Sequence, residues 1–152
     1  MNKPKLIVYD FDGVMTDNRV LVDEFGKEAV VVNRGDGYGV SQIKKLGILQ
    51  VIISTEVNKV VKMRAEKLDI PVIHGVENKK NVLLEYVGKQ GIDLKDVFYV
   101  GNDLNDYDAM ILAGTKCAPK DAEPEILEIA DWVSVCNGGY GVIRDLFRNL
   151  SK

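Results

Sequence analysis

The amino-acid sequence predicts an α/β fold: a three-layer, Rossmann-like domain in which helices cover both faces of a parallel sheet. The first observation is that short apolar runs alternate with stretches of helical periodicity along the chain, as in parallel sheets with crossover helices. The second is that Gly47, Gly88 and Gly114 follow helical stretches, where a left-handed residue often ends a helix.

The apolar runs and the periodic stretches define the expected elements in order. We expect strands at Leu6–Tyr9, Val51–Ile53, Val72–Ile73, Val97–Val100, Cys117–Ala118 and Val133–Val135. We expect helices at about Tyr38–Leu46, Asn58–Leu68, Asn81–Val87, Asp106–Ala113, Glu123–Ala130 and Val142–Leu150. In the third helix, for example, apolar residues recur at the spacing of one buried face.

One segment departs from this alternation. Residues 19–32 contain two β-rich stretches around a turn near residues 24–27, which predicts a β-hairpin inserted after the first strand. Isolated two-stranded hairpins are marginal in water, and this one is apolar at many positions. We therefore expect its partner strands on another copy of the chain; the alternative is that it packs on its own domain.

Length and composition restrict the function further. The 152 residues, 46% of them hydrophobic and 28% charged, fit one globular domain over 1–152 and leave no room for a second domain of ordinary size. A formal net charge of −3 gives no basic surface for nucleic acid. No apolar run is long enough to span a membrane, and the N-terminus lacks a signal-like core. We expect a cytoplasmic protein.

Polar residues follow four of the predicted strands. They are Asp10 and Asp12 after the first, Ser54, Thr55 and Glu56 after the second, Lys79 and Lys80 beyond the third, and Asn102, Asp103 and Asp106 after the fourth. Ligands of open α/β sheets bind at this carboxyl edge. Because acidic oxygens suit Mg²⁺, and a hydroxyl and an ammonium suit phosphate, the sequence predicts adjoining magnesium and phosphate sites.

The order of these motifs resembles the haloacid dehalogenase superfamily of phosphotransferases. The resemblance rests on D-F-D-G-V-M-T-D at residues 10–17, a strand-end serine, a downstream lysine and G-N-D-L-N-D at residues 101–106, and it spans nearly the whole chain. It implies that Asp10 is the nucleophile that forms an aspartyl-phosphate and that Asp12 is the general acid and base. Mg²⁺ and the phosphoryl group would then offset the repulsion between the two carboxylates.

The resemblance also implies phosphate ligands. Ser54 is the expected hydroxyl, with a simple turn cap as its alternative role. The family spacing from Gly75 favours Lys79 as the ammonium that binds phosphate, and Lys80 remains the alternative.

The third metal ligand has two candidates. Beside Asp10 and the backbone oxygen of Asp12, we expect Asp103. Many relatives carry Asp where this chain has Asn102, so the alternative is the Asn102 amide oxygen, with Asp103 or Asp106 hydrogen-bonding to the ligands.

Two further segments resemble a capless subgroup, the 3-deoxy-octulosonate 8-phosphate phosphatases and their nonulosonate relatives. They are R-G-D-G-Y-G at residues 34–39 and G-G-Y-G-V-I-R at residues 138–144. This resemblance implies a homotetramer in which the hairpins assemble and a neighbouring subunit covers each active site.

Within the subgroup, residues 54–56 are informative. Octulosonate phosphatases usually have Thr-Gly-Arg there, whereas Ser-Thr-Glu, with Arg64 and Lys67 further on, resembles phosphatases of sialic acid biosynthesis. The resemblance implies that Thr55, Glu56, Arg64 and Lys67 bind the substrate. The leading substrate is 2-keto-3-deoxynononate 9-phosphate, followed by N-acetylneuraminate 9-phosphate; the alternative is 3-deoxy-octulosonate 8-phosphate.

The helical pattern supports a binding role for Arg64. On a helical wheel it falls among Val57, Val61 and Leu68, an unfavourable place for an unpaired charge. We expect a carboxylate partner, either Glu56 of a neighbouring chain or the sugar acid itself; the alternative is a solvated helix edge with the Arg64 stem on the core.

Two other classes of function compete with a phosphatase. Signalling receiver domains also use Mg²⁺ and a phosphorylated aspartate on a small parallel α/β scaffold. Asp12 argues against this class, because a switch needs no general acid two residues after its phosphorylated Asp. The third class is a catalytically silent interaction module.

Overall fold

The computed structural model describes residues 3–152 and places the first strand, β1, at the centre of a six-stranded parallel sheet. The strand order is β5-β4-β1-β6-β7-β8. These strands are β1 (Leu6–Tyr9), β4 (Leu49–Ile53), β5 (Val72–Ile73), β6 (Val97–Val100), β7 (Thr115–Ala118) and β8 (Trp132–Val133). All six predicted strands are therefore present, although the last lies at Trp132–Val133 and not at Val133–Val135. The chain reverses its direction of crossover on the two sides of β1.

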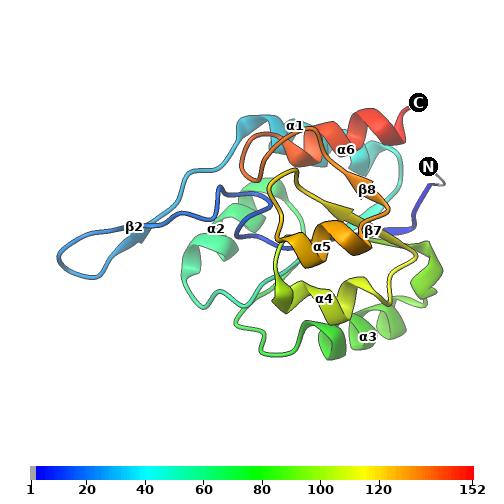
Figure 1. Cartoon of the computed structure of the whole chain (residues 1–152), viewed down its shortest axis with the longest axis horizontal. Helices are drawn as coiled ribbons and strands as arrows, with labels where there is room; N and C mark the ends of the chain where they lie inside the picture. The colour runs from blue at the N-terminus through cyan, green and yellow to red at the C-terminus, as the bar shows by residue number, and fades with distance from the viewer. Residues whose placement is uncertain (1–2) are drawn as a thin grey trace.

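Six α-helices cover the sheet in two layers, as Figure 1 shows. They are α1 (Arg34–Lys45), α2 (Lys59–Leu68), α3 (Lys79–Gln90), α4 (Leu104–Met110), α5 (Pro124–Ile129) and α6 (Val142–Leu150), with a 3₁₀ turn, η1, at Leu94–Asp96. Helices α1, α2 and α6 share one apolar cluster, and α3, α4 and α5 share the other. None of the helices within residues 3–152 combines the length and hydrophobicity that crossing a membrane requires.

The central strand shows why the sheet needs both helical layers. Ile7 and Tyr9 pack into the cluster with α1, α2 and α6, whereas Leu6 and Val8 pack into the opposite cluster. All four side chains are fully buried. A strand buried on both faces reads as a continuous apolar run, which is the pattern that identified it in the sequence.

Helix boundaries differ from expectation where local capping decides them. Helix α1 begins at Arg34, four residues earlier than predicted, because the Asn33 side chain accepts a 2.7 Å hydrogen bond from the Gly35 amide. Gly88 lies inside α3 and does not end it; Gly91, with φ 64°, provides the left-handed C-cap. Gly114 has no positive φ and instead allows the backbone of Lys95 to approach closely.

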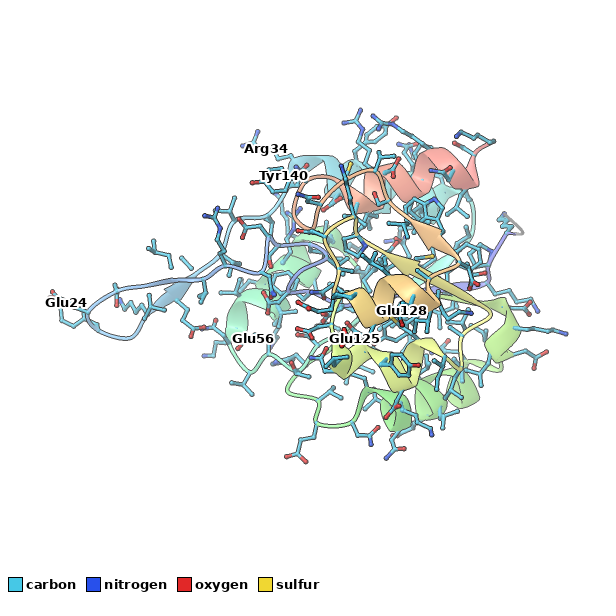
Figure 2. All side chains as sticks on the ribbon, viewed as in Figure 1. Glu24, Arg34, Glu56, Glu125, Glu128 and Tyr140 are labelled. Carbon is cyan, nitrogen blue, oxygen red and sulfur yellow. The ribbon has the colours of Figure 1, made fainter. Side chains whose placement is uncertain are left out.

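The predicted hairpin is present and extends from the body of the protein (Figures 1 and 2). Its strands β2 (Leu21–Val22) and β3 (Glu28–Ala29) pair only with each other. Leu21 is 73% exposed and Phe25 near the tip is 80% exposed. Only the base packs on the body, through partly buried Val30 and Val32. The alternative of a hairpin packed on its own domain therefore holds for the base and is wrong for the tip.

Candidate active site

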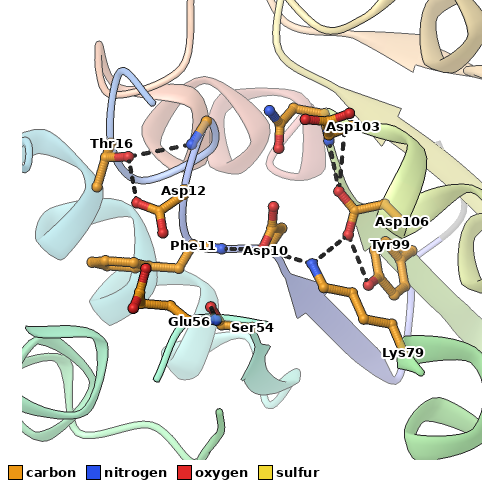
Figure 3. Close-up of polar contacts among 12 residues, drawn as sticks. Asp10, Phe11, Asp12, Thr16, Ser54, Glu56, Lys79, Tyr99, Asp103 and Asp106 are labelled. Carbon is orange, nitrogen blue, oxygen red and sulfur yellow. Dashed lines mark hydrogen bonds and ion pairs between the residues drawn. The ribbon is translucent and has the colours of Figure 1, made fainter. Parts of the chain in front are cut away.

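Several of the predicted polar residues, among them Asp10, Ser54 and Lys79, meet at the carboxyl ends of β4, β1 and β6 (Figure 3). Asp10 continues β1, and its amide donates a 2.9 Å hydrogen bond to the carbonyl of Val100 at the end of β6. Ser54 directly follows β4, and Asn102 lies two residues beyond β6. Because the crossover direction reverses at β1, this is where open α/β sheets leave a crevice for ligands.

Lys79 links two of the acids by ion pairs. Its Nζ lies 2.7 Å from Asp10 Oδ1 and 2.7 Å from Asp106 Oδ1. Lys79 is the first residue of α3, and its side chain is buried in the site, as are the two carboxylates. Lys80, the alternative, has an exposed side chain and forms no ion pair with the described residues. Of the two candidates, the fold brings only Lys79 into the site.

Asp106 is committed to internal hydrogen bonds. Its Oδ1 accepts from Lys79 and from the Tyr99 hydroxyl at 3.1 Å, and its Oδ2 accepts from the amides of Asn102 at 3.0 Å and Asp103 at 3.3 Å. It is fully buried. The carboxylate therefore holds Lys79 and the loop after β6 in place and has no oxygen turned to solvent. Tyr99 lies within an apolar strand, so no local pattern in the sequence distinguishes it as a site residue.

The site contains more negative than positive charge. Two buried carboxylates share the single ammonium of Lys79. Burial and the charge of Asp106 raise the pKa of Asp10 to about 8, against the opposing effect of Lys79. Burial also raises the pKa of Asp12, and the nearby Glu56 charge adds to that shift while a hydrogen bond from Thr16 opposes it. A bound divalent cation would offset this excess charge.

Three groups converge where such a cation could bind. One terminal atom of the Asn102 amide lies 3.0 Å from Asp10 Oδ2 and 2.8 Å from the backbone oxygen of Asp12. With its nitrogen there, Asn102 donates two hydrogen bonds; with its oxygen there, the three oxygens form the hard ligand set that Mg²⁺ prefers. Gly13 leaves the space, since a Cβ at that position would lie 1.9 Å from the amide.

Asp103, the expected metal ligand, has a different environment. It is the N-cap of α4, and its Oδ1 accepts a 2.6 Å hydrogen bond from the Leu104 amide. Helix capping therefore occupies this carboxylate. The geometry brings Asn102, the alternative, against Asp10 and Asp12.

Residues 54–56, which follow β4, lie on the other side of β1 from Asn102 and Asp106, which follow β6. Ser54 is buried, and its Oγ accepts a 3.0 Å hydrogen bond from the Glu56 amide, so it does cap a turn. Its hydroxyl proton is still available, and the cap and a phosphate contact are compatible. The Glu56 side chain is half-buried and accepts from the Asn58 amide at 2.7 Å, whereas Thr55 is exposed.

A cavity of about 200 Å³ opens beside Asp12. Its walls come from Phe11 and Asp12, from residues 18–20, 28 and 30 at the hairpin base, and from residues 56, 58 and 60 before and within α2. Of the expected substrate-binding residues, Glu56 therefore lines the same cavity as Asp12. Thr55 is not among the residues that line it. Sites for drug-sized ligands usually enclose about 300–1,000 Å³, so this cavity is small for a sugar acid unless something else covers it.

Arg64 and Lys67 do not reach this cavity. They line a separate hollow of about 690 Å³ between α1 and α2, together with the basic residues Arg34 and Lys44. Arg64 donates a 3.1 Å hydrogen bond to the carbonyl of Asn33. Within one chain, the substrate contacts expected for Arg64 and Lys67 are therefore not formed.

The charge of a buried carboxylate, Asp36, also acts on Arg64. Burial lowers the pKa of Arg64, and the charge of Asp36 opposes that shift. Asp36 is buried in α1 and accepts a 3.0 Å hydrogen bond from the Ile143 amide at the start of α6. The expected need for a partner is thus met in part by the chain's own Asn33 carbonyl and Asp36.

Comparison with known proteins decides the family. A match to the haloacid dehalogenase-like hydrolases covers residues 40–146. The chain belongs to this family. A family relative, the 3-deoxy-D-manno-octulosonate 8-phosphate phosphatase of Escherichia coli K12, is 32% identical over 143 residues, which cover 93% of this chain and 76% of the relative.

One solved structure and one further curated protein are also similar to this chain. The crystal structure of the same kind of phosphatase from Moraxella catarrhalis, in complex with magnesium, phosphate and KDO, aligns with a TM-score of 0.93 and 28% identity, covering 97% of this chain and 85% of that one. N-acylneuraminate cytidylyltransferase A of Danio rerio is 26% identical over 96% of this chain, which spans only 34% of that protein.

We expect Lys79→Met to destabilise the protein strongly. The substitution leaves Asp10 and Asp106 buried without a cation, and breaking such a pair lowers the free energy of unfolding by about 3–5 kcal/mol. Burial raises the pKa of Asp10 to about 8 even with the ammonium present, and loss of the ammonium raises it further, so the deficit relative to wild type should grow as pH rises from about 7 to about 9. Urea denaturation in EDTA measures it.

Lys80→Met is the matched control for this experiment. Its side chain is exposed, so the free energy of unfolding should change by no more than about 0.5 kcal/mol. Equal losses in the two variants would contradict the structural role assigned to Lys79.

Proposed function

We propose that the protein is a Mg²⁺-dependent phosphomonoesterase that hydrolyses a sugar-acid phosphate through an aspartyl-phosphate intermediate. The observation that carries the proposal is the convergence of Asp10, the Asp12 backbone oxygen and the Asn102 amide beside the buried Lys79. This set provides a nucleophile, cation ligands and a fixed positive charge in one place. Membership of the hydrolase family supports it.

In the first step, a carboxylate oxygen of Asp10 attacks phosphorus and forms a new P–O bond. The P–O bond to the sugar breaks, and the departing oxygen takes a proton from Asp12. In the second step, water attacks the same phosphorus and gives a proton to Asp12, while the P–O bond to Asp10 breaks and phosphate is released. Both carboxylates end as they began.

Lys79 and Ser54 supply the remaining contacts to phosphate. The ammonium of Lys79 neutralises phosphoryl oxygens, and the Ser54 hydroxyl donates to them. Asp10, the Asp12 carbonyl and the Asn102 side-chain oxygen would hold Mg²⁺, which when bound withdraws charge from the phosphoryl group. In this proposal Asp103 and Asp106 support the loop, because their carboxylates are engaged in α4 and with Lys79.

For the substrate we propose a nine-carbon acid, 2-keto-3-deoxynononate 9-phosphate first and N-acetylneuraminate 9-phosphate second. The cavity beside Asp12 is where the departing sugar would lie, because Asp12 protonates its oxygen, and Glu56 lines that cavity. A carboxylate there favours sugar hydroxyls as partners. The similarity to the Danio rerio cytidylyltransferase also supports an acylneuraminate-like ligand.

The alternative substrate is 3-deoxy-octulosonate 8-phosphate. It is favoured by the Escherichia coli relative, which is 32% identical, and by the KDO bound in the Moraxella catarrhalis structure. The choice between the nine-carbon and the eight-carbon acid depends on which groups of the substrate face Glu56 in the cavity. Its carboxylate accepts hydrogen bonds from hydroxyl groups and repels a carboxylate.

We also propose that the enzyme is a homotetramer whose active sites are completed by neighbours. Hairpin residues Val20, Leu21, Val22, Phe25 and Val31 are each at least 50% exposed, and such an apolar surface favours burial against another copy. The surface of one protomer that carries Arg64 and Lys67 would then lie over the cavity beside Asp12 in the adjoining protomer. There the two basic side chains would bind the carboxylate of the sugar acid.

A signalling role is the competing proposal of another class. It would share Asp10, the cation and Lys79, and differ in having no use for Asp12 as an acid. The Asp12 side chain lines a cavity that could hold a leaving group, which favours an enzyme.

The enzyme proposal predicts sustained turnover. With Mg²⁺, the protein should release phosphate from p-nitrophenyl phosphate at a steady rate, and EDTA should abolish the release. Asp10→Asn and Asp12→Asn should each reduce kcat by at least about 10²-fold. A single equivalent of released nitrophenol followed by a stable phosphoprotein would instead favour a signalling domain.

The substrate proposal predicts an order of kcat/KM. In a panel of sugar-acid phosphates, kcat/KM for the nine-carbon esters should exceed that for 3-deoxy-octulosonate 8-phosphate by about tenfold or more. Glu56→Gln should reduce this ratio of kcat/KM values. Glu66→Gln, on the exposed side of α2, is the control and should leave the ratio unchanged. Faster turnover of the eight-carbon ester by the unmodified enzyme would reverse the assignment.

The assembly proposal predicts complementation between an inactive and an impaired subunit. Asp10→Asn lacks a nucleophile, and Arg64→Ala should weaken binding of the acid, raising KM about 10-fold or more. Mixed tetramers formed after co-expression should regain part of the wild-type kcat/KM, since an intact Asp10 can meet an intact Arg64 from a neighbour. No recovery in purified mixed tetramers would mean that Arg64 acts within its own chain or not at all.

A further inference from the structure

We propose that Thr16 is a positioning residue for Asp12: its hydroxyl holds Oδ1 of that carboxylate, so that the proton exchanged in the reaction is carried by Oδ2. The inference rests on the proposed function and adds a residue to it. Thr16 lies in the loop after β1, four residues beyond Asp12, and is fully buried.

The hydrogen bonds of the Thr16 hydroxyl allow only one direction for its proton. Its oxygen accepts from the amides of Gly13 and Asn18, both at 3.2 Å, and its proton is donated to Asp12 Oδ1 at 3.1 Å (Figure 3). A hydroxyl has one donor and two acceptor positions, so all three are used. Because no solvent reaches the group, the direction of its proton is fixed.

This has a direct consequence for Asp12. Oδ1 must act as an acceptor towards Thr16, so a protonated Asp12 carries its proton on Oδ2. Within residues 3–152 no donor is bonded to Oδ2, and the residue borders the cavity in which the departing sugar would lie. The proton thus leaves Oδ2 for the sugar oxygen as the P–O bond breaks, and a proton from water returns to Oδ2 in the second step.

The loop around Thr16 is held from the far end of the chain. The Gly139 amide donates a 3.0 Å hydrogen bond to the carbonyl of Val14. Gly138 packs so closely that a Cβ there would lie 2.0 Å from the Gly13 carbonyl oxygen and 3.0 Å from that of Thr16. In addition, Thr16 forms an isolated antiparallel bridge with Val32 at the hairpin base. The hydroxyl is therefore fixed by packing as well as by its own bonds.

Thr16→Val tests the inference, because valine keeps the branched shape and lacks the hydroxyl. The measurement is kcat/KM for a sugar or alkyl phosphate and for p-nitrophenyl phosphate, because this constant covers substrate binding and departure of the leaving group and excludes hydrolysis of the aspartyl-phosphate. An alkoxide needs a proton to leave, whereas nitrophenolate does not. We expect the ratio of alkyl to aryl kcat/KM to fall about 10- to 100-fold.

Thr16→Ser provides the matched control, because it retains the hydroxyl and should restore the ratio to within about threefold of wild type. The proposal would be overturned if Thr16→Val lowered kcat/KM equally for both esters. It would also be overturned if Thr16→Ser lowered kcat/KM for the alkyl ester alone by as much as Thr16→Val does. Thr16→Ala provides the same comparison if valine impairs folding, as judged by thermal unfolding.

The controls separate this inference from the proposed function. If the wild-type protein turns over both esters and Asp10→Asn abolishes both activities, the function stands and the ratio alone decides the role of Thr16. If the wild-type protein hydrolyses neither ester, the proposed function fails and the inference fails with it.

Discussion

The ion pairs of Lys79 with Asp10 and Asp106 are the constraint on which the site depends. An ammonium buried at the start of α3 is tolerated only because two carboxylates surround it, and those carboxylates are tolerated only because it is there. The balance is incomplete, since the acids outnumber the cation and the pKa of Asp10 is raised. A fold arranged in this way carries excess negative charge that a bound cation can relieve, so the same groups affect both the stability of the protein and its ability to bind a cation.

Much of this arrangement can be predicted from sequence, because the pattern that makes a buried parallel strand also determines where it ends. The six apolar runs identified the sheet, and the polar residues after four of them identified its reactive edge. The choice between Lys79 and Lys80 could not be made as firmly, since it depends on which side of α3 faces the sheet. The structure resolves that orientation, because Lys79 is buried and Lys80 is exposed.

Other features depend on contacts that no local pattern contains. The early start of α1 follows from one side-chain cap at Asn33, and the position of Arg64 follows from the packing of α2 on α1, which turns it towards the Asn33 carbonyl. Sequence similarity grouped Arg64 with the active site, whereas the single chain separates them. Thr16 was visible in the D-G-V-M-T-D motif, but only the hydrogen bonds of its hydroxyl distinguish it from an ordinary loop threonine.

The contact of Gly138 and Gly139 with the loop after β1 has a consequence for synthesis of the protein. A ribosome makes Asp10 and Asp12 more than a hundred residues before the glycines that fix their loop. Until position 139 has left the exit tunnel, a nascent chain lacks the packing that orders the loop after β1. Hydrolytic competence should therefore arise late and abruptly during translation, and partial products would carry the motif without the activity.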